Sequence, residues 1–272
     1  MRSVRQIREL SAFYNSRLTR AGNHLDRGEQ QYITVKADKR HRQYDAKFYR
    51  ELGSGQESAR EILPIIFEVV KPVSVVDIGC GTGDWLAVAR DLGAQILGID
   101  GDWVSKSQLA IPPENFAVRD LTLPLVLDRR FDLALSFEVA EHLPAAVAPV
   151  FVKSLCDAAD VVAFSAAIPG QGGRHHVNEQ WPDYWAKLFG DFGYFCYDYL
   201  RPRIWNNPQI AWYYAQNSLI FAHQGVGRAF GEAAPPMSLV HPKLWSAEVA
   251  RRKHPGKLLE RLAKAILSPV RQ

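Results

Sequence analysis

The chain has 272 residues, of which 47% are hydrophobic, enough for one α/β domain with extensions or for a domain and a half. No apolar run approaches the roughly 18–20 residues that a membrane-spanning helix needs, and no apolar signal core follows the basic N-terminus. The formal net charge of +4 is uneven, because residues 1–50 carry +7 and residues 241–272 carry +6, whereas residues 51–240 carry −9.

The predicted elements begin with a polar helical segment over residues 1–57 and an amphipathic helix over residues 58–70, which stops before Pro72. Strand-like and helical segments alternate from there. The predicted strands cover residues 73–78, 95–100, 116–121, 131–137, 160–168, 194–200 and 210–223. The predicted helices between them cover residues 84–93, 103–110, 145–159 and 181–193.

This alternation predicts an α/β fold, with a parallel sheet and helices on both of its faces. The last two predicted strands have no helix between them, which indicates an antiparallel pair at one edge of the sheet. We therefore expect one domain over residues 58–223, preceded by the helical N-terminal segment. Residues 224–245 are expected to form a loop, and residues 257–267 a basic amphipathic helix, within a C-terminal extension over 224–272.

The three cysteines give information about the compartment. Cys80, Cys156 and Cys196 are scattered and odd in number, and their spacing fits neither a disulfide framework nor a metal site. A reducing compartment is the default for such a chain, so we expect a cytoplasmic protein.

A glycine-rich turn follows the first predicted strand, in the sequence Gly79-Cys80-Gly81-Thr82-Gly83-Asp84. A dinucleotide fingerprint requires G-x-G-x-x-G, and here Asp84 stands where the third glycine would be, so a carboxylate would face the pyrophosphate. A Walker loop is excluded because no G-K-[ST] follows. The turn is better suited to a cationic sulfonium amino acid, whose ammonium group needs an acidic partner.

Two carboxylates end the next two predicted strands. Asp100 is placed to accept hydrogen bonds from both hydroxyls of a ribose. Asp120 is placed to accept one from an adenine amino group, with Leu121 packed near the ring. The glycine turn and the two acids, in this order, indicate a ligand that carries adenosine.

The stretches VVDIGCGTGDWL, GID, RDL and FDLALSFEVAEHLP resemble the ordered motifs of class I S-adenosylmethionine-dependent methyltransferases, over roughly residues 58–222. The resemblance implies a Rossmann-like sheet of seven strands, the last antiparallel, and S-adenosyl-L-methionine as the cofactor. The residues that we expect to bind this cofactor are Asp77, Gly79, Cys80, Gly81, Gly83, Asp100, Gly101, Asp120, Leu121 and Glu138.

The fourth predicted strand is followed by Glu138 to His142, an E-x-x-E-H sequence. The [DN]-P-P-[YF] of DNA and protein-amide methyltransferases is absent, as is the Pro-Cys pair of cytosine-carbon methyltransferases. The E-x-x-E-H form resembles the small-molecule branch, which acts on quinones, lipids, sugars and natural products, often at oxygen. A hydroxyl acceptor gains from a base, so His142 is a candidate base or else a residue that shapes the cofactor pocket.

A second polar cluster, IPGQGGRHHVNEQWP at residues 168–182, follows the fifth predicted strand and is expected at the same sheet edge. His176 and Glu179 are candidates for catalysis or acceptor contact, or else they brace the loop. Trp181 and Trp185 are candidates for a flat face that binds sugar. A metal site that includes His175 and His176 is disfavoured, because adjacent histidines usually point apart, so no metal is expected.

This cluster, with AWYYAQN later in the chain, resembles a subgroup of bacterial methyltransferases commonly found with polysaccharide and secondary-metabolite biosynthesis genes. The resemblance implies a glycan or another hydroxylated small molecule as acceptor, and hence O-methylation. Two alternatives remain open: N-methylation of an amino sugar or RNA, and a cofactor-binding protein without catalysis. The acidic middle of the chain argues against a nucleic acid, and the polar clusters argue against a non-catalytic protein.

The two ends of the chain allow more than one interpretation. Tyr44, Phe48, Tyr49 and Ser58 belong either to a lid over the cofactor or to a packing helix. The basic helix over residues 257–267 either packs on the domain or makes weak contact with a membrane surface. The sequence does not indicate an oligomeric state.

Overall fold

A computed structural model describes residues 55–252. The predicted N-terminal segment therefore lies almost wholly outside the described residues, as do Tyr44, Phe48, Tyr49 and the predicted helix over 257–267.

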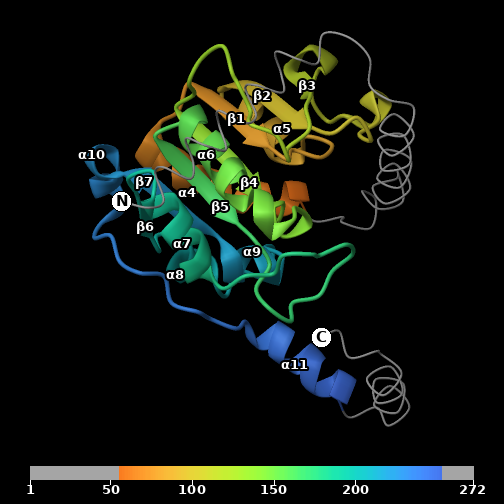
Figure 1. Ribbon diagram of the computed structural model, residues 1–272, viewed down its shortest axis with the longest axis vertical. Coiled ribbons are helices and arrows are strands. Elements are labelled where there is room, and N and C mark those ends of the chain that lie inside the picture. Colours follow the sequence, from red (N-terminus) through yellow and green to blue (C-terminus); the bar gives the residue numbers. More distant parts are fainter. Residues whose placement is uncertain (1–54, 253–272) are drawn as a thin grey trace. The chain divides into compact units, whose positions relative to one another are not determined.

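The centre of the fold is one sheet of seven strands in the order β3-β2-β1-β4-β5-β7-β6 (Figure 1). β7 runs antiparallel to both β5 and β6, and the other neighbouring pairs are parallel. The predicted α/β sheet with an antiparallel last strand is therefore confirmed. The strands are β1 (Ser74–Ile78), β2 (Gln95–Asp100), β3 (Phe116–Val118), β4 (Leu133–Phe137), β5 (Val161–Ser165), β6 (Tyr194–Tyr197) and β7 (Leu219–His223).

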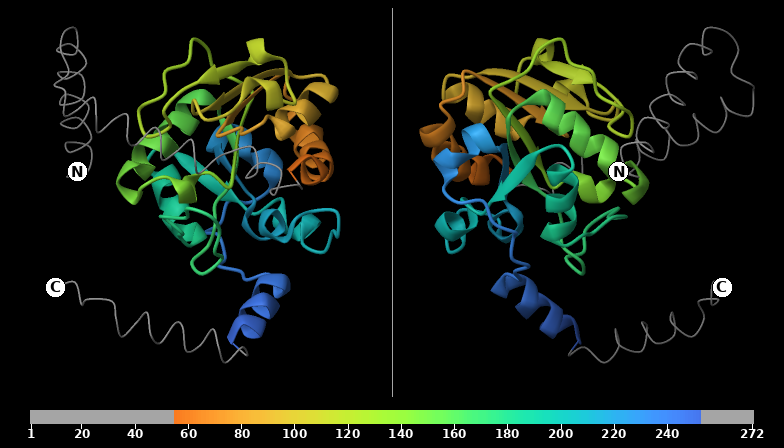
Figure 2. Two further views of the ribbon diagram at one scale, coloured as in Figure 1. Left: turned by 90° about the vertical axis from the view of Figure 1, so that its right-hand side faces the viewer. Right: turned by 60° about the vertical axis from the view of Figure 1, so that its left-hand side comes forward.

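Helices cover both faces of this sheet, as the two views of Figure 2 show. Val75 of β1 packs into a core with α4 (Gly55–Val70) and α5 (Asp84–Asp91). Its neighbour Val76 faces the opposite core, with α6 (Ala148–Ala158) and α7 (Pro182–Gly190). Because β1, β4 and β5 are buried along their whole length, they consist almost entirely of apolar residues rather than alternating ones.

The segment predicted as a long last strand, 210–223, is different in the structure. Residues Trp212–Asn217 form helix α9, and only Leu219–His223 form β7. Helix α8 (Arg201–Ile204) also lies between β6 and β7, so the prediction of two strands without a helix between them was wrong. Of the three aromatic residues on this helix, Tyr214 is buried and contacts Trp85 and Phe137. Tertiary packing here outweighs strand propensity.

Several short 3-10 turns complete the connections. The predicted helix over 103–110 is reduced to the turn η1 (Lys106–Gln108). The others are η2 (Pro113–Asn115), η3 (Ala140–His142), η4 (Ala145–Val147) and η5 (Arg228–Phe230).

The segment after β7 contains more helix than the sequence predicted. Helices α10 (Gln224–Gly227) and α11 (Pro242–Arg252) flank an extended stretch. Arg201, only 1% exposed, is paired with Asp198 and donates a hydrogen bond to the Met237 carbonyl, which ties this stretch to the domain. Within residues 55–252, no helix combines the length and the apolarity that crossing a membrane requires.

Candidate functional site

The strand order reverses between β1 and β4, and in open α/β sheets ligands bind in the crevice at such a point. Gly79 follows β1, Asp100 ends β2, and Glu138 follows β4. The loop over residues 168–182 follows β5 at the same edge. The topology therefore brings the glycine turn and both predicted polar clusters to one edge of the sheet.

The glycine turn depends on backbone conformations that side chains disfavour. Gly79, Gly81 and Gly83 all have positive φ angles, of 91°, 52° and 86°. A Cβ atom at Gly79 would overlap the methyl carbons of Val139, and one at Gly83 would lie 2.9 Å from Ile111. The turn is thus open toward the crevice and closely packed behind, with Cys80 buried beneath it.

Asp100 is joined directly to this turn. One carboxylate oxygen accepts a hydrogen bond from the Gly81 amide at 2.7 Å, and the other accepts one from the Gly101 amide at 2.6 Å. Burial raises the pKa of Asp100 to about 6, although the two amides oppose the rise. Burial raises the pKa of Asp77 further, helped by the negative charges of Asp100 and Asp84. The floor of the site is therefore acidic and sheltered from water.

The third predicted acid is less enclosed. Asp120 lies two residues beyond the end of β3, is exposed, and accepts hydrogen bonds from the amide and hydroxyl of Thr122. Leu121 beside it is buried. The sequence analysis missed Trp103, whose ring covers Gly101 so closely that a Cβ atom there would overlap it. The only sequence signal for Trp103 was its position three residues after the acid that ends a strand.

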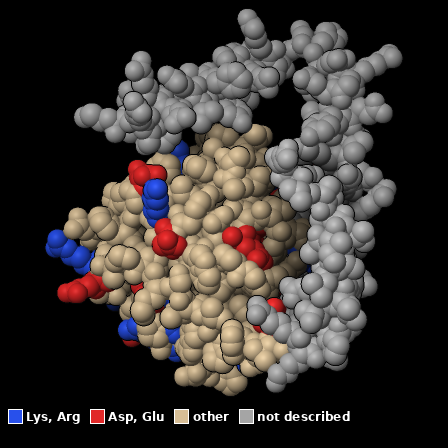
Figure 3. Space-filling view, turned by 60° about the horizontal axis from the view of Figure 1, so that its bottom comes forward, with Lys and Arg blue, Asp and Glu red and all other residues tan. Residues whose placement is uncertain are grey.

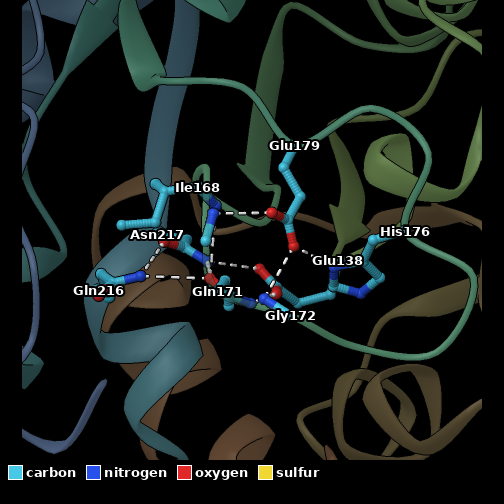
Figure 4. A network of polar contacts seen from close by, with 9 residues as sticks. Glu138, Ile168, Gln171, Gly172, His176, Glu179, Gln216 and Asn217 are labelled. Carbon is cyan, nitrogen blue, oxygen red and sulfur yellow. Dashed lines mark hydrogen bonds and ion pairs between the residues drawn. The ribbon is translucent and has the colours of Figure 1, made fainter. Parts of the chain in front are cut away.

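Glu138 is held by a buried network of amide side chains (Figure 4). Its carboxylate accepts hydrogen bonds from Gln171 Nε2 at 2.8 Å and Asn217 Nδ2 at 3.0 Å. Asn217 and Gln216 in turn donate to Gln171 Oε1. Glu138 also has a φ angle of 55°, a strained value for a non-glycine residue. The network fixes the loop after β5 against α9, and its two amides on α9 were assigned by sequence to a strand.

A second group of polar side chains lies beside this network. Glu141, His142 and His176 place one ligand atom each within 4.8 Å of one another. The rings of His142 and His176 are 4.9 Å apart and nearly perpendicular. The pKa of His142 is lowered to about 3, chiefly by burial and then by the proximity of His176. His142 is therefore neutral at pH 7, and its weak basicity argues against it as the base.

His176 is positioned by Glu179, as the close-up in Figure 4 shows. Its Nδ1 lies 2.9 Å from Glu179 Oε1, and the same carboxylate accepts hydrogen bonds from the Gly170 and Gly172 amides at 2.8 Å each. Two backbone amides in the glycine-rich half of the loop therefore donate hydrogen bonds to Glu179 in its second half. The structure brings His142 and His176 together, and their roles as base or acceptor contacts stay predictions.

Some predicted site residues lie elsewhere. Trp185 is 2% exposed and packs against Phe164, so it offers no face for a sugar. Trp181 is 38% exposed and retains that possibility. Ser58 is fully buried and accepts a hydrogen bond from the Ala211 amide at 3.0 Å, which gives it a packing role.

The face of the protein in Figure 3 is formed mostly by uncharged residues, with acidic side chains scattered across it. Its described part has no broad basic patch of the kind that binds a nucleic acid.

Comparison with known proteins places the chain in a family. The sequence profile of the family described as a methyltransferase domain matches residues 20–213, more than half of the chain. No curated protein sequence matches it.

Solved structures with a similar arrangement have low sequence identity. Human N-acetylserotonin methyltransferase, solved in complex with SAM, is 15% identical with a TM-score of 0.43, over 61% of this chain and 51% of that one. The chain thus spans about half the length of that protein. Magnesium protoporphyrin IX methyltransferase from Synechocystis PCC 6803 is 17% identical with a TM-score of 0.44, over 62% and 80%. The methyltransferase domain of bacterial CtHen1 is 18% identical with a TM-score of 0.44, over 61% and 96%.

The family match covers the sheet from β1 to β5, the glycine turn and both polar clusters. The strand order, with its antiparallel β7, is the one that the class I motifs implied. The chain belongs to the methyltransferase-domain family, and the part that matches, residues 20–213, is an S-adenosylmethionine-dependent methyltransferase domain.

Proposed function

We propose that this methyltransferase acts at a hydroxyl group of a sugar, a glycan precursor or another hydroxylated small molecule. The observation that carries the proposal is the cluster of Glu141, His142 and His176, which lies at the sheet edge beside the glycine turn. Neutral imidazole and carboxylate groups are suited to binding a hydroxyl and to taking up its proton.

The glycine turn and its neighbours fit the methyl donor. The positive φ angles of the three glycines let the backbone turn tightly, so that backbone rather than side chains faces the methionine part of the donor, and Asp84 suits its ammonium group. Asp100 is buried with both oxygens facing backbone amides, in a position to exchange such contacts for ribose hydroxyls. Asp120 and Leu121 are then placed for the adenine. When bound, the donor supplies an electrophilic methyl group on a sulfonium sulfur.

The chain's own residues then have to align the acceptor and manage its proton. In-line alignment alone supplies an effective concentration of about 10⁵–10⁸ M, so the enzyme needs little covalent chemistry. His176, oriented by Glu179, is the histidine better suited to assist the hydroxyl, because the pKa of His142 is about 3. His142 is assigned to acceptor contact.

A glycan-like acceptor is supported by the loop over residues 168–182. The loop presents polar side chains next to the exposed face of Trp181, a combination that suits a ring with both hydroxyl groups and an apolar face. Polysaccharide or natural-product biosynthesis in a bacterium is the setting that this acceptor class suggests.

The test begins with calorimetry of S-adenosylhomocysteine, using the full chain and its Asp100→Ala variant. We expect micromolar binding to the wild type and loss of at least 10-fold in affinity in the variant. Asp102→Ala is the matched control, because Asp102 is an exposed carboxylate two residues away. Equal affinity in all three proteins would contradict the assignment of Asp100.

The acceptor class is tested separately. Glycan and natural-product extracts are screened with a methyl-labelled donor, and the linkage of the label is determined by mass spectrometry. A label on hydroxyl oxygen supports the proposal, and a label only on nitrogen would contradict it.

A further inference from the structure

A single histidine is enough to act as a base, but the structure has a cluster of three titratable side chains, Glu141, His142 and His176. It combines one carboxylate and two imidazoles from two separate segments, η3 and the loop after β5. Within the described residues, their ligand atoms lie within 4.8 Å of one another. Two histidines with one carboxylate are a common ligand set for divalent transition metals.

Glu141 provides the strongest evidence that a positive partner belongs here. Its side chain is 0% exposed, and neither carboxylate oxygen has a hydrogen bond of acceptable geometry among the described residues. Burial, and then the negative charge of the neighbouring Glu138, raise the pKa of Glu141 well above its usual range, so the ionised form lacks a positive partner there. Burying a carboxylate costs far more than burying a neutral polar group unless it is paired or coordinates a metal. The Glu141 carbonyl also accepts the amides of Val177 and Asn178 at 2.9 and 3.0 Å, which holds this residue against the histidine loop.

His176 has the arrangement that is usual for a metal ligand. When its Nδ1 donates to Glu179 Oε1, at 2.9 Å, its Nε2 carries the lone pair and lies against Gly173, where a Cβ atom would overlap it. Metal-bound histidines commonly donate their other nitrogen to a carboxylate, which fixes the tautomer and the ring orientation. Glu179 is itself fixed by the Gly170 and Gly172 amides.

We propose that Glu141, His142 and His176 bind a divalent transition-metal ion, with Glu179 positioning His176. Two nitrogen ligands favour zinc, iron or cobalt over magnesium, calcium and manganese, which prefer oxygen. Ligand atoms about 2.1 Å from one ion lie roughly 3–4 Å apart, so the cluster has to contract by about 1 Å when the ion binds. Three protein ligands leave coordination positions open.

The site lies next to the donor turn. Val139, two residues before Glu141, packs directly behind Gly79. This step rests on the proposed function: the acceptor hydroxyl would bind at the ion's open positions. A divalent ion lowers the pKa of a hydroxyl that is bound to it. The hydroxyl proton leaves to water, the oxygen forms a bond to the methyl carbon, and the bond from that carbon to sulfur breaks, with its electron pair going to sulfur. With the ion bound, His142 and His176 act on the acceptor hydroxyl through the metal, which replaces the direct contacts assigned to them above. This site also differs from the sequence expectation of no metal.

The experiment uses the full chain, freed of metal by dialysis against a chelator, and titrates it with Co²⁺. We expect one equivalent of Co²⁺ to bind, with visible absorption bands typical of nitrogen and oxygen ligands. Glu141→Gln and His176→Ala should each weaken Co²⁺ binding at least 10-fold. His175→Asn is the matched control, because His175 neighbours His176 but lies outside the cluster, and asparagine tolerates its φ of 63°. Mg²⁺ should bind more weakly than Co²⁺.

Two further measurements keep the outcomes distinct. S-adenosylhomocysteine binding to the same variants should stay within about threefold of wild type, because the donor turn is unchanged. Co²⁺ should raise the melting temperature of the wild type but not that of Glu141→Gln, whose isosteric side chain preserves the packing. Absence of saturable Co²⁺ binding, or equal binding by Glu141→Gln, would overturn the metal site. Absence of S-adenosylhomocysteine binding to the wild type would instead overturn the donor assignment.

Discussion

Asp100 is one carboxyl group through which the predicted donor site gains a pH dependence, beside Asp77 and Asp84, whose pKa values burial also raises. Burial raises the pKa of Asp100 to about 6, so the group changes charge within the range in which proteins are stable. Accepting hydrogen bonds from two ribose hydroxyls requires the ionised form. The affinity for S-adenosylhomocysteine should therefore reach its maximum above pH 7. It should fall by up to about 10-fold for each pH unit below pH 6.

Calorimetry between pH 5 and pH 8 checks this expectation. Asp100→Asn is the control, because it cannot ionise and should bind weakly with little dependence on pH. The pKa of His142, about 3, is too low to contribute a slope in this range. A flat profile for the wild type would show that Asp100 does not contact the ligand in its ionised form.

At the same scale, some candidate site residues could be predicted from the sequence and others could not. Asp100 and the glycines were identifiable because their chemistry follows from a local pattern, a strand followed by a turn. Gln171 and Asn217 were not, because an amide gains its role only from a partner distant in sequence, here Glu138. Glu141 was seen only as part of E-x-x-E-H, and its lack of hydrogen bonds depends on the folded environment.

At the scale of an element, the turn between β1 and α5 can be tested with two matched glycines. Gly79 and Gly93 have similar φ angles, 91° and 97°, so alanine meets the same backbone strain at both, about 1–2 kcal/mol. A Cβ atom meets Val139 at Gly79 but has open space at Gly93. Gly79→Ala should therefore lower the free energy of unfolding by a further 1–3 kcal/mol or so, as overpacking does.

Urea unfolding of both variants measures this difference. Gly79→Ala should also lose affinity for S-adenosylhomocysteine, whereas Gly93→Ala should retain it. Equal destabilisation by the two substitutions would mean that Val139 moves aside and that the turn is not confined from behind.

The elements that sequence analysis misplaced share a physical cause. Helix α9 carries three aromatic residues in its sequence WYYAQN, which favour a strand by propensity. Its helical form places Tyr214 in the core and the amides of Gln216 and Asn217 in the buried network around Glu138. Neither contact can be read from local sequence. The buried strands β1, β4 and β5 were predicted because continuous apolar runs leave few alternatives.

At the scale of the whole molecule, binding of the donor should stabilise the fold through the turn that joins β1 to α5. A ligand that binds only the native state at 100 times its Kd adds about 2.7 kcal/mol to the free energy of unfolding. For a domain of about 200 residues, each kcal/mol raises the melting temperature by roughly 2–4 °C. Saturating S-adenosylhomocysteine should thus raise Tm by about 5–10 °C in a thermal scan, and Asp100→Ala should abolish the shift. NAD at the same concentration should give no shift, because Asp84 begins α5 where a dinucleotide fold would have its third glycine. A comparable shift with NAD would overturn the interpretation of the glycine turn from which the site was built.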